Sequence, residues 1–536
     1  MEQIILEIIK SKPKKAGDLM KIKRILAKKY HFAIIRNSDI YKEYRGLLAA
    51  GKTKEDLNLE KLLKKRAIRT MSGIAPVAVL TKPYACPGKC AYCPHEKNVP
   101  TSYLSNEPAV MRAIRHKYNP YDQVYSRLEA LVANGHKPEK IELIVIGGSW
   151  SVLPKAYKYW FIKECFRAAN TFAISKLQLA IRGKENKSLQ VLKAGLLKEQ
   201  KKNEGAKYKI IGITLETRPD YINEKELVEM REFGATRVEL GVQAPDDKIL
   251  EINKRGHGVL EIAQATALLR AFGFKITYHL MPGLPGSNPA KDLEMFKMIF
   301  GDERFQPDQI KFYPTVVTRG SELYKWWKAG KYQPYTDQEL ETLIVDCKNA
   351  IPEYVRIIRL IRDIPGESIE AGNKITNLRQ IMKQKGVVCR CIRCRECGEQ
   401  KIKAKDLRLS KIIFAAAGGK EYFIQFESLD KKILYGFCRL RIPIQEKIKT
   451  KNFSFLNSCA LVRELHIYGE LTTIGGKKKT QHGGLGKRLL MEAEKIAKQE
   501  GFKNVAVISG VGVRSYYRKS GYTLKEGYMV KRLMLK

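Results

Sequence analysis

Acidic residues and long apolar runs are scarce in this sequence. Asp and Glu number 56 against 99 Lys and Arg, which gives the 536-residue chain a formal charge of +43 at pH 7. No apolar run reaches the ~18 residues that a membrane-spanning helix requires, and the chain begins Met1-Glu-Gln-Ile without the basic start of a signal peptide. We therefore expect a soluble cytoplasmic protein with no membrane partner, whose natural ligand is a polyanion.

Cysteines are few, and seven of the eleven fall in two compact groups. They are Cys86, Cys90 and Cys93 in the first group and Cys389, Cys391, Cys394 and Cys397 in the second. Such spacing is typical of metal ligands rather than of a disulfide framework, so it predicts a reducing compartment. The four isolated cysteines are expected to be small core residues, namely Cys165, Cys347, Cys438 and Cys459.

Basic residues concentrate at the start of the chain. Residues 1–70 hold 19 Lys and Arg against 8 Asp and Glu, and apolar residues recur there at helical spacing from Ile4 to about Ile68. We expect a small basic helical region over residues 1–70 that contacts nucleic-acid phosphates, the alternative being an evenly lysine-rich surface. Besides residues 64–66, the candidate contacts are Lys12, Lys14, Lys15, Lys21, Lys23 and Arg24.

Short β-branched runs alternate with amphipathic stretches over residues 71–385. This alternation predicts an α/β domain with a parallel sheet, and the number of repeats favours a full or partial (β/α) barrel. The predicted strands span residues 77–80, 141–146, 210–215, 238–242, 276–280, 310–312 and 357–361. Because the sites of such barrels lie at the carboxyl ends of strands, functional side chains should follow these runs.

The pattern changes beyond the second cysteine group. Antiparallel-looking strands at residues 420–426 and 433–442 precede a strand at 463–468, a helix at 485–500 and a strand at 505–509. These elements predict a compact α+β domain over residues 401–536, joined to the barrel by a cysteine-rich linker over residues 386–400. Residues 475–480 are expected to form a basic loop.

The first cysteine group follows a predicted strand with the spacing C-x3-C-x2-C. Three such thiolates can hold three irons of a [4Fe–4S] cluster and leave the fourth iron open to a cosubstrate. A three-cysteine zinc site completed by His95 is the alternative.

The next strand ends in Gly147-Gly148-Ser149, where close backbone approach can take an amino group. Together with the cysteines, this segment resembles the radical SAM superfamily. The resemblance implies that S-adenosylmethionine (SAM) binds the open iron and yields a 5′-deoxyadenosyl radical. It also places Glu216, Arg218 and Gln243 in the SAM pocket.

A glycine-rich motif, Gln481-His-Gly-Gly-Leu-Gly486, stands at a predicted helix start, where backbone N–H groups and the helix dipole can hold a pyrophosphate. With the strand at 463–468 before it and Tyr516-Tyr517 after it, the order resembles the GNAT superfamily of N-acetyltransferases. That resemblance implies acetyl-CoA as ligand and a tyrosine general acid, Tyr517 or alternatively Tyr516. A phenol of ordinary pKa, near 10, suits donation to a leaving thiolate. Two ordinary packed tyrosines are the alternative.

The second cysteine group could close a tetrahedral zinc site that pins the linker between the domains. A second iron–sulfur cluster and metal-free thiols are the alternatives.

From about residue 70 onward, longer segments resemble the family of the catalytic subunit of Elongator. They span residues 84–94, 107–115, 213–220, 238–243, 253–257, 279–286, 463–469 and 508–512. The family implies a tRNA uridine acetyltransferase that begins carboxymethylation at C5 of the wobble uridine. Its partner is a tRNA anticodon stem-loop, and accessory subunits or a homodimer are compatible with it. Its acetyl-CoA contacts carry over to Lys140, Glu464, Leu465, His466, Ile467, Gly484, Leu485, Gly486, Lys487 and Tyr517.

The implied reaction joins both motifs. The radical takes a hydrogen atom from the acetyl methyl, the carbon radical adds to uridine C5, and water, helped by Tyr517, releases CoA. The two sites must then face each other, and the wobble base must leave its stack. Two alternatives remain. A protein lysine acetyltransferase would leave the cysteine triad unexplained, and a non-catalytic RNA-binding scaffold would leave the acetyl-CoA loop unexplained.

Overall fold

The computed structural model describes residues 1–64, 72–172, 188–375, 377–398, 407–444, 450–469 and 484–533. The predicted domain boundaries near residues 70 and 400 lie outside these ranges. So do Lys65 and Arg66, the predicted loop at 475–480, and Gln481 to Gly483 of the glycine-rich motif. Among the described residues, no helix is both long and apolar enough to cross a membrane.

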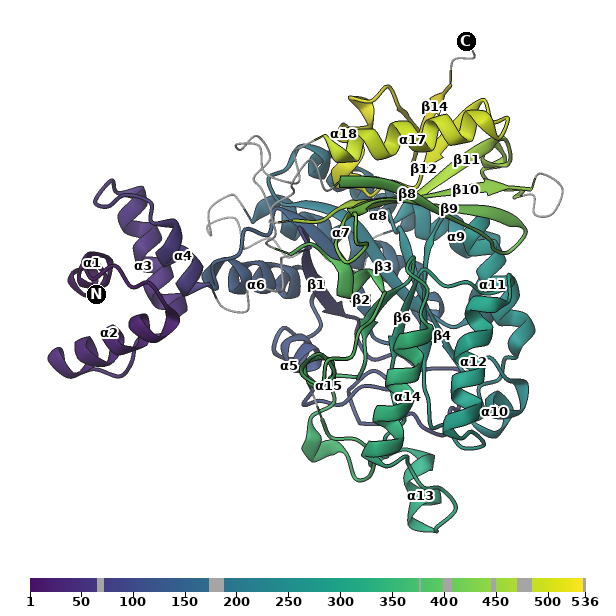
Figure 1. Ribbon diagram of the computed structural model, residues 1–536, viewed down its shortest axis with the longest axis horizontal. Coiled ribbons are helices and arrows are strands. Elements are labelled where there is room, and N and C mark those ends of the chain that lie inside the picture. The colour runs from purple at the N-terminus through teal and green to yellow at the C-terminus, as the bar shows by residue number, and fades with distance from the viewer. Residues whose placement is uncertain are drawn as a thin grey trace.

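The N-terminal region consists of helices and stands to one side of the molecule (Figure 1). Its helices are α1 (Glu2–Lys10), α2 (Ala16–Lys29), α3 (Asn37–Ala49) and α4 (Leu57–Leu63). The i, i+3, i+4 spacing of their apolar residues turns one face of each helix inward. Ile5, Ile8, Tyr44 and Leu59 meet there in a core of their own, separate from the main core. The predicted helical region is confirmed.

Seven parallel strands form the barrel sheet in chain order. They are β1 (Ala75–Leu80), β2 (Lys140–Ile146), β3 (Lys209–Thr217), β4 (Arg237–Gln243), β5 (Lys275–Leu280), β6 (Gln309–Phe312) and β7 (Arg356–Arg359). All seven predicted strands are therefore present. β1 pairs only with β2, and β7 only with β6, among the described residues, so the barrel is partial and open between β1 and β7.

Helices cover the outer face of this sheet. They are α5 (Pro108–Arg115), α6 (Pro120–Ala133), α7 (Lys155–Thr171), α8 (Leu189–Gly205), α9 (Glu224–Glu232), α10 (Asp247–Ile252), α11 (Val259–Ala271), α12 (Pro289–Gly301), α13 (Glu322–Lys328), α14 (Asp337–Ala350), α15 (Leu378–Gln384) and α16 (Ile392–Arg395). Alternate strand residues point to opposite faces. In β2, Ile141, Leu143 and Val145 pack outward in the core, and Glu142 and Ile144 line the inside.

The C-terminal domain is a second seven-stranded sheet, in the order β13-β14-β12-β11-β10-β9-β8. Its elements are β8 (Leu407–Ala415), β9 (Gly419–Ser428), β10 (Leu434–Pro443), β11 (Cys459–Ile467), α17 (Leu485–Gln499), β12 (Asn504–Val507), α18 (Arg514–Arg518), β13 (Thr523–Lys525) and β14 (Tyr528–Arg532). The predicted helix and the strands at β9, β10, β11 and β12 are confirmed. β8, β13 and β14 were not expected.

The C-terminal domain packs against the amino ends of the barrel strands. Arg463 of β11 donates hydrogen bonds to the Phe274 carbonyl just before β5, at 2.6 Å, and to the Asp308 carboxylate just before β6, at 3.0 Å. A Cβ on Gly510 would lie 1.9 Å from the carbonyl oxygen of Ile211, so the two backbones touch. Arg463 and Asp308 are buried, and the charges are therefore compensated inside the boundary.

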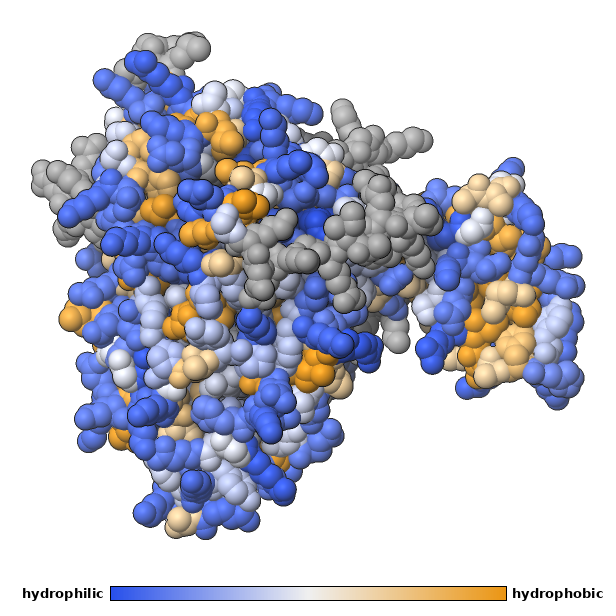
Figure 2. All heavy atoms as spheres, turned by 180° about the vertical axis from the view of Figure 1, so that it is seen from behind, coloured by the Kyte–Doolittle hydropathy of each residue, from blue (hydrophilic) through white to orange (hydrophobic). Residues whose placement is uncertain are grey.

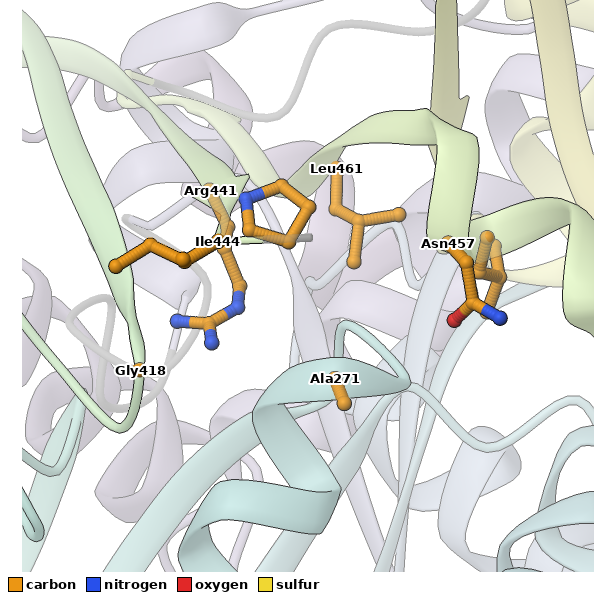
Figure 3. A pocket seen from close by; sticks show the side chains of 8 residues that line it. Ala271, Gly418, Arg441, Ile444, Asn457 and Leu461 are labelled. Atoms are coloured by element: carbon orange, nitrogen blue, oxygen red, sulfur yellow. The ribbon is translucent and has the colours of Figure 1, made fainter. Parts of the chain in front are cut away.

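Near the end of α11 this boundary is closely packed. Figure 3 shows a small cavity between Ala271 at the end of α11 and the C-terminal side chains Arg441, Ile444, Asn457 and Leu461. Its volume of about 20 Å³ has room for about one water molecule. Seen from behind, hydrophilic side chains dominate the surface of the barrel, in keeping with the surplus of Lys and Arg (Figure 2).

Candidate functional site

A cavity of about 690 Å³ opens at the carboxyl ends of the barrel strands. All of the predicted cluster and SAM residues line this barrel cavity: Cys86, Cys90, Cys93, Gly147, Gly148, Ser149, Glu216, Arg218 and Gln243. They come from the loop after β1 and from the ends of β2, β3 and β4. The parallel topology therefore gathers residues that are more than a hundred positions apart in the chain.

Glycine backbone conformations shape the wall of this cavity at the end of β2. Gly147 and Gly148 have φ values of +130° and +90°, which residues other than glycine rarely adopt. A Cβ on Gly147 would also stand 2.2 Å from Thr81 Oγ1, so the ends of β1 and β2 touch there. Gln243 keeps a left-handed φ of 68° without being glycine, a strained conformation that is common at functional sites.

The first cysteine group meets a buried arginine. Arg255 Nη1 donates a hydrogen bond to Cys90 Sγ at 3.1 Å. The hydrogen bond from Cys93, together with the nearby charge of Arg255, lowers the pKa of Cys90 to about 5, although burial opposes the shift. Cys90 is thus held as a thiolate, which is the form that binds metal.

The zinc alternative for the first cysteine group lacks its fourth ligand. His95 is exposed and is not part of the cavity lining. The three cysteines do line the cavity, and their sulfurs could hold three irons of a cluster that leaves the fourth iron open.

Unsatisfied polar atoms point to a missing ligand. Arg218 Nη1, Gln243 Oε1 and the Tyr92 hydroxyl are buried and find no hydrogen-bond partner among the described residues. Buried polar atoms normally have partners, so a polar ligand in the barrel cavity would satisfy them. Arg218 also braces the cysteine loop, because a Cβ on Gly88 would lie 2.5 Å from Arg218 Nη1.

Deeper in the barrel lies a buried charged group that the sequence did not reveal. Glu239 of β4 pairs with His279 of β5 at 2.9 Å and with Lys311 of β6. Burial raises the pKa of Glu239, but Lys311 and His279 outweigh it and hold the pKa well below its usual range. Glu216 joins the group through His279, whose Nδ1 lies 3.7 Å from Glu216 Oε1, and it also accepts a hydrogen bond from the Tyr103 hydroxyl at 3.0 Å. Strand alternation within residues 238–243 could have marked Glu239 as inward-facing.

A second cavity, of about 390 Å³, lies between the C-terminal domain and the amino ends of the barrel strands. Most of the predicted acetyl-CoA residues line this C-terminal cavity: Lys140, Glu464, Leu465, His466, Ile467, Gly484, Gly486, Lys487, Tyr516 and Tyr517. Leu485 is the exception, because its side chain is buried in the core. The two cavities thus open at opposite ends of the strands rather than facing each other directly.

The C-terminal cavity exists because two parallel strands diverge. β11 and β12 pair only as far as Val462 and Val507. Beyond that point β11 keeps its partner β10, with a register shift opposite Arg463, while β12 ends. Residues 464–466 therefore turn toward the cavity the backbone edge that no longer faces β12, and a long polar arm could bind this edge.

The start of α17 closes one end of the same cavity. Gly484 caps the helix with a φ of 79°, and a Cβ on Gly486 would stand 3.1 Å from the Tyr516 hydroxyl. The first N–H groups and the positive end of this 15-residue helix face a space that a side chain at residue 486 would crowd. This is a suitable place for a phosphate group.

Both tyrosines differ from the ordinary phenol that the sequence suggested. Burial raises the pKa of Tyr517 well above 10, and it raises the pKa of Tyr516 to about 12. Both phenols therefore stay protonated across the working pH range. Burial also opposes ionisation of Glu464, but Lys275 and Arg439 lower its pKa to about 2, so this strand residue is held as a carboxylate.

The second cysteine group is only partly gathered. The Sγ atoms of Cys389, Cys391 and Cys394 lie within 4.8 Å of one another, which is close enough for one metal ion. Cys397 is outside this set, and its thiol points to the Gly398 carbonyl at 3.9 Å. Hydrogen bonds from Cys389 and Cys394 hold the pKa of Cys391 well below its usual value.

One of the predicted phosphate contacts is misplaced. Lys12, Lys14, Lys15, Lys21 and Arg24 are exposed on the N-terminal helices and their connections. Lys23 instead is buried, its ammonium donates to Asn37 Oδ1 at 3.0 Å, and burial lowers its pKa. It lies on the inward face of α2, where the helical period places it beside Leu19 and Leu26, and it is not presented to a ligand.

Comparison with known proteins agrees with this geometry. The radical SAM superfamily matches residues 81–299, and the radical SAM C-terminal domain matches residues 307–386. A tRNA uridine(34) acetyltransferase of Dehalococcoides mccartyi is 44% identical over 479 residues, which cover 88% of this chain and 100% of that protein. Elongator complex protein 3 of Bos taurus is 38% identical over 493 residues, covering 88% of this chain and 86% of that protein.

A solved structure extends the likeness to three dimensions. The archaeal Methanocaldococcus infernus Elp3 with N-terminus deletion (1–46) is 39% identical, with a TM-score of 0.71. The match covers 87% of this chain and 100% of that one. The chain belongs to the family of tRNA uridine(34) acetyltransferases and Elongator complex protein 3, and its barrel is a radical SAM domain.

Proposed function

We propose that this chain modifies the wobble uridine of tRNA, using acetyl-CoA and SAM to form 5-carboxymethyluridine. The observation that carries the proposal is that two cavities of different chemistry share lining residues, namely Ser72, Ile74 and Glu142. One is lined by the radical SAM residues and the other by the predicted acetyl-CoA residues. A lysine acetyltransferase would need only the second cavity and would leave the first unexplained.

The residues of the barrel cavity would hold the cluster and bind SAM. Cys86, Cys90 and Cys93 would hold a [4Fe–4S] cluster, which with SAM supplies a 5′-deoxyadenosyl radical when both are bound. Arg255 keeps Cys90 in the thiolate form. The unsatisfied Arg218 Nη1 and Gln243 Oε1 offer a donor and an acceptor that match the carboxylate and ammonium groups of an amino acid.

The residues of the C-terminal cavity would bind acetyl-CoA and protonate the departing thiolate. The start of α17 would take the pyrophosphate through its free N–H groups, with Lys487 adding a positive charge at the cavity wall. The divergent end of β11 would hydrogen-bond the pantetheine arm. Tyr517, buried and protonated, would give its proton to the departing CoA thiolate. A phenol of raised pKa is a weak acid, so the transfer is favourable only as the thiolate forms.

The remaining features suit binding of RNA and a structural metal. The exposed N-terminal basic residues and the net charge of +43 would attract the tRNA backbone. Cys389, Cys391 and Cys394 would bind zinc, with a fourth ligand from Cys397 after a local movement or from water. Such a site would tie α16 to the strand that precedes it, because the Ile392 amide donates to the Val355 carbonyl at 2.9 Å.

The test is a reaction with all components present. Anaerobically reconstituted protein, tRNA, SAM, a reductant and isotopically labelled acetyl-CoA are incubated, and the nucleosides are analysed by mass spectrometry. We expect labelled 5-carboxymethyluridine from a tRNA with uridine at the wobble position and none from a matched tRNA with cytidine there. Acetylated lysine on a basic peptide, with no labelled nucleoside, would contradict the proposal and favour the acetyltransferase alternative.

A further inference from the structure

The two cavities meet along the inner face of one barrel strand. Ser72, Ile74 and Glu142 line both cavities. From there the barrel cavity continues past Pro76 and Ala78 toward the cysteine loop. Ile74, Pro76 and Ala78 are alternate residues and therefore share one face, and the intervening Ala75 and Val77 pack outward in the core. We call the space lined by Ser72, Ile74, Pro76, Ala78 and Glu142 the passage.

Charged side chains pair across the barrel interior beside the passage. Arg237 of β4 reaches across to Glu142 of β2 at 2.9 Å, and it also bonds Thr214 of β3 at 2.8 Å and Gln309 of β6 at 3.2 Å. One layer further along the strands, Glu239 binds His279 and Lys311. These two polar layers line the barrel cavity on the side of β4 to β6, and the passage runs beside them along β1.

The entrance to the passage is held in place from the C-terminal domain. His466 of β11 lies with Nε2 3.0 Å from the Ser72 carbonyl oxygen. A carbonyl only accepts, so Nε2 carries the proton and donates it. Burial lowers the pKa of His466, which keeps the ring neutral. The strand that is predicted to hold the pantetheine arm thus contacts the first residue of the passage directly.

From these shared lining residues we infer that the thioester arm of acetyl-CoA enters the barrel through the passage and delivers its acetyl end to the radical site from the amino ends of the strands. The inference rests on the proposed function, because it requires acetyl-CoA in the C-terminal cavity. The occupant follows from charge and shape. The arm is long, unbranched and uncharged, and three wall residues, Ile74, Pro76 and Ala78, are apolar. The Glu142 carboxylate at the junction is paired with Arg237, and the phosphate groups of the CoA nucleotide would instead be held by the start of α17.

The first experiment tests where the arm goes, in cluster-free protein. Single variants Ile74→Cys and Ala78→Cys place a thiol at the entrance and about 13 Å further along the strand, at 3.3 Å per residue. Bromoacetyl-CoA is the probe. The thiolate sulfur attacks the methylene carbon, a thioether forms, and bromide leaves. Peptide mapping by mass spectrometry distinguishes the introduced thiol from the native cysteines.

We expect saturable labelling at both positions, roughly tenfold or more above the rate at an exposed control, Ile413→Cys on β8, because binding holds the reagent close to the thiol. Free CoA should compete, and adding Gly486→Glu should remove the advantage. Bromoacetamide, which lacks the nucleotide, corrects for accessibility. Labelling at Ile74→Cys without labelling at Ala78→Cys would overturn the inference, because the acetyl end would then stop at the junction. Absence of labelling at both would overturn it as well.

The second experiment obstructs the passage in the complete enzyme. Ala78→Trp should reduce the modified nucleoside by about 100-fold or more while the nucleotide of acetyl-CoA still binds at α17, whereas Ile413→Trp on the exposed face of β8 should behave as the unaltered protein. Melting temperatures of both variants show whether the tryptophan is tolerated, and the labelling result stands if it is not. An obstructed variant that modifies tRNA at the normal rate would overturn the inference. Failure of the unaltered protein to bind acetyl-CoA at all would instead overturn the proposed function.

Discussion

The two cavities differ in the kind of group that forms their binding surfaces: ionisable side chains in one, backbone groups in the other. The barrel cavity is lined by ionisable side chains that come from the ends of most of its strands, among them Glu216, Glu239, Arg255, His279 and Lys311. The C-terminal cavity relies on backbone geometry within two short stretches, the divergent end of β11 and the glycine start of α17. Removal of a side-chain functional group should therefore abolish ligand binding in the barrel cavity. Addition of a side chain should abolish ligand binding in the C-terminal cavity.

The largest expected effect is loss of the metal site. In the triple variant Cys86→Ala, Cys90→Ala, Cys93→Ala, anaerobic reconstitution should give no bound cluster, against about four irons per chain in the unaltered protein. Acetyl-CoA binding should persist, because the C-terminal cavity contains none of these residues. Iron analysis and equilibrium dialysis measure both.

The matched control for this variant is Cys347→Ala, a buried cysteine outside both cavities, which should take up iron normally. Zinc uptake without iron by the unaltered triad would contradict the prediction. It would also show that the two cysteine groups share one chemistry.

The opposite change, the addition of a side chain, should be nearly as damaging to the other cavity. Gly486→Glu would place a Cβ 3.1 Å from the Tyr516 hydroxyl and a carboxylate where the pyrophosphate is expected. Repulsion between two charges near the protein surface is worth about 4 kcal/mol at 4 Å, so acetyl-CoA affinity should fall by roughly 10³-fold.

The control is Gly205→Glu at the end of α8, where an added Cβ has open space. It should bind acetyl-CoA normally, and both variants should keep the cluster. If Gly486→Glu bound acetyl-CoA with unchanged affinity, the start of α17 would be only a turn, and the contrast between the cavities would fail.

The same contrast explains what the sequence could predict. Strand positions, the cysteine spacing and the glycine motif are local, so the seven barrel strands, the cysteine triad and the start of α17 could be located from pattern alone, whereas the other predicted lining residues came from resemblance to known families. The Glu239, His279 and Lys311 group is formed by three strands that meet only in the folded barrel. No local spacing encodes such a group.

Burial was the second source of error. Lys23 stands beside predicted phosphate contacts in sequence, but the helical period turns its side chain into a core. Cys397 follows the other three cysteines closely, and yet its sulfur is outside the group because it follows the end of α16. β8, β13 and β14 escaped notice because β8 and β13 are edge strands whose mixed exposure gives a weak pattern.

A smaller effect is expected from the general acid. Tyr517→Phe should slow acetyl-CoA hydrolysis by ~10²-fold with little change in binding, because a single proton donor is lost. Burial raises the pKa of Tyr517, so the phenol remains protonated in mildly alkaline solution, and its contribution should not decline as the pH rises from neutrality to about 9.

Tyr516→Phe and Tyr522→Phe are the controls. Tyr516 lines the cavity with a pKa raised to about 12, and Tyr522 donates to Glu494 at 2.8 Å outside it. If Tyr516→Phe alone slowed hydrolysis, the general acid would be the neighbouring residue. Equal effects of all three variants would indicate a packing role.

The smallest effect concerns a region that belongs to neither cavity. Reversal of Lys12, Lys14, Lys15, Lys21 and Arg24 to Glu should weaken tRNA binding and flatten its salt dependence, because each phosphate neutralised contributes about 0.7–0.9 to the slope of log K against log salt. Acetyl-CoA binding and cluster content should stay unchanged. The matched control reverses five exposed lysines of the C-terminal domain, namely Lys411, Lys431, Lys432, Lys495 and Lys503, and so makes the same change in net charge.

Lys23→Glu separates the two roles of lysine within this one region. Its ammonium bonds Asn37 inside the N-terminal core, so the substitution should lower the melting temperature and leave the salt slope unchanged. The five-residue charge reversal should leave the melting temperature unchanged and flatten the salt slope, because its side chains are exposed and do not pack in the core. Salt titrations that gave the N-terminal and C-terminal reversals the same slope would mean that net charge alone attracts tRNA. The barrel mouth would then have to supply recognition by itself.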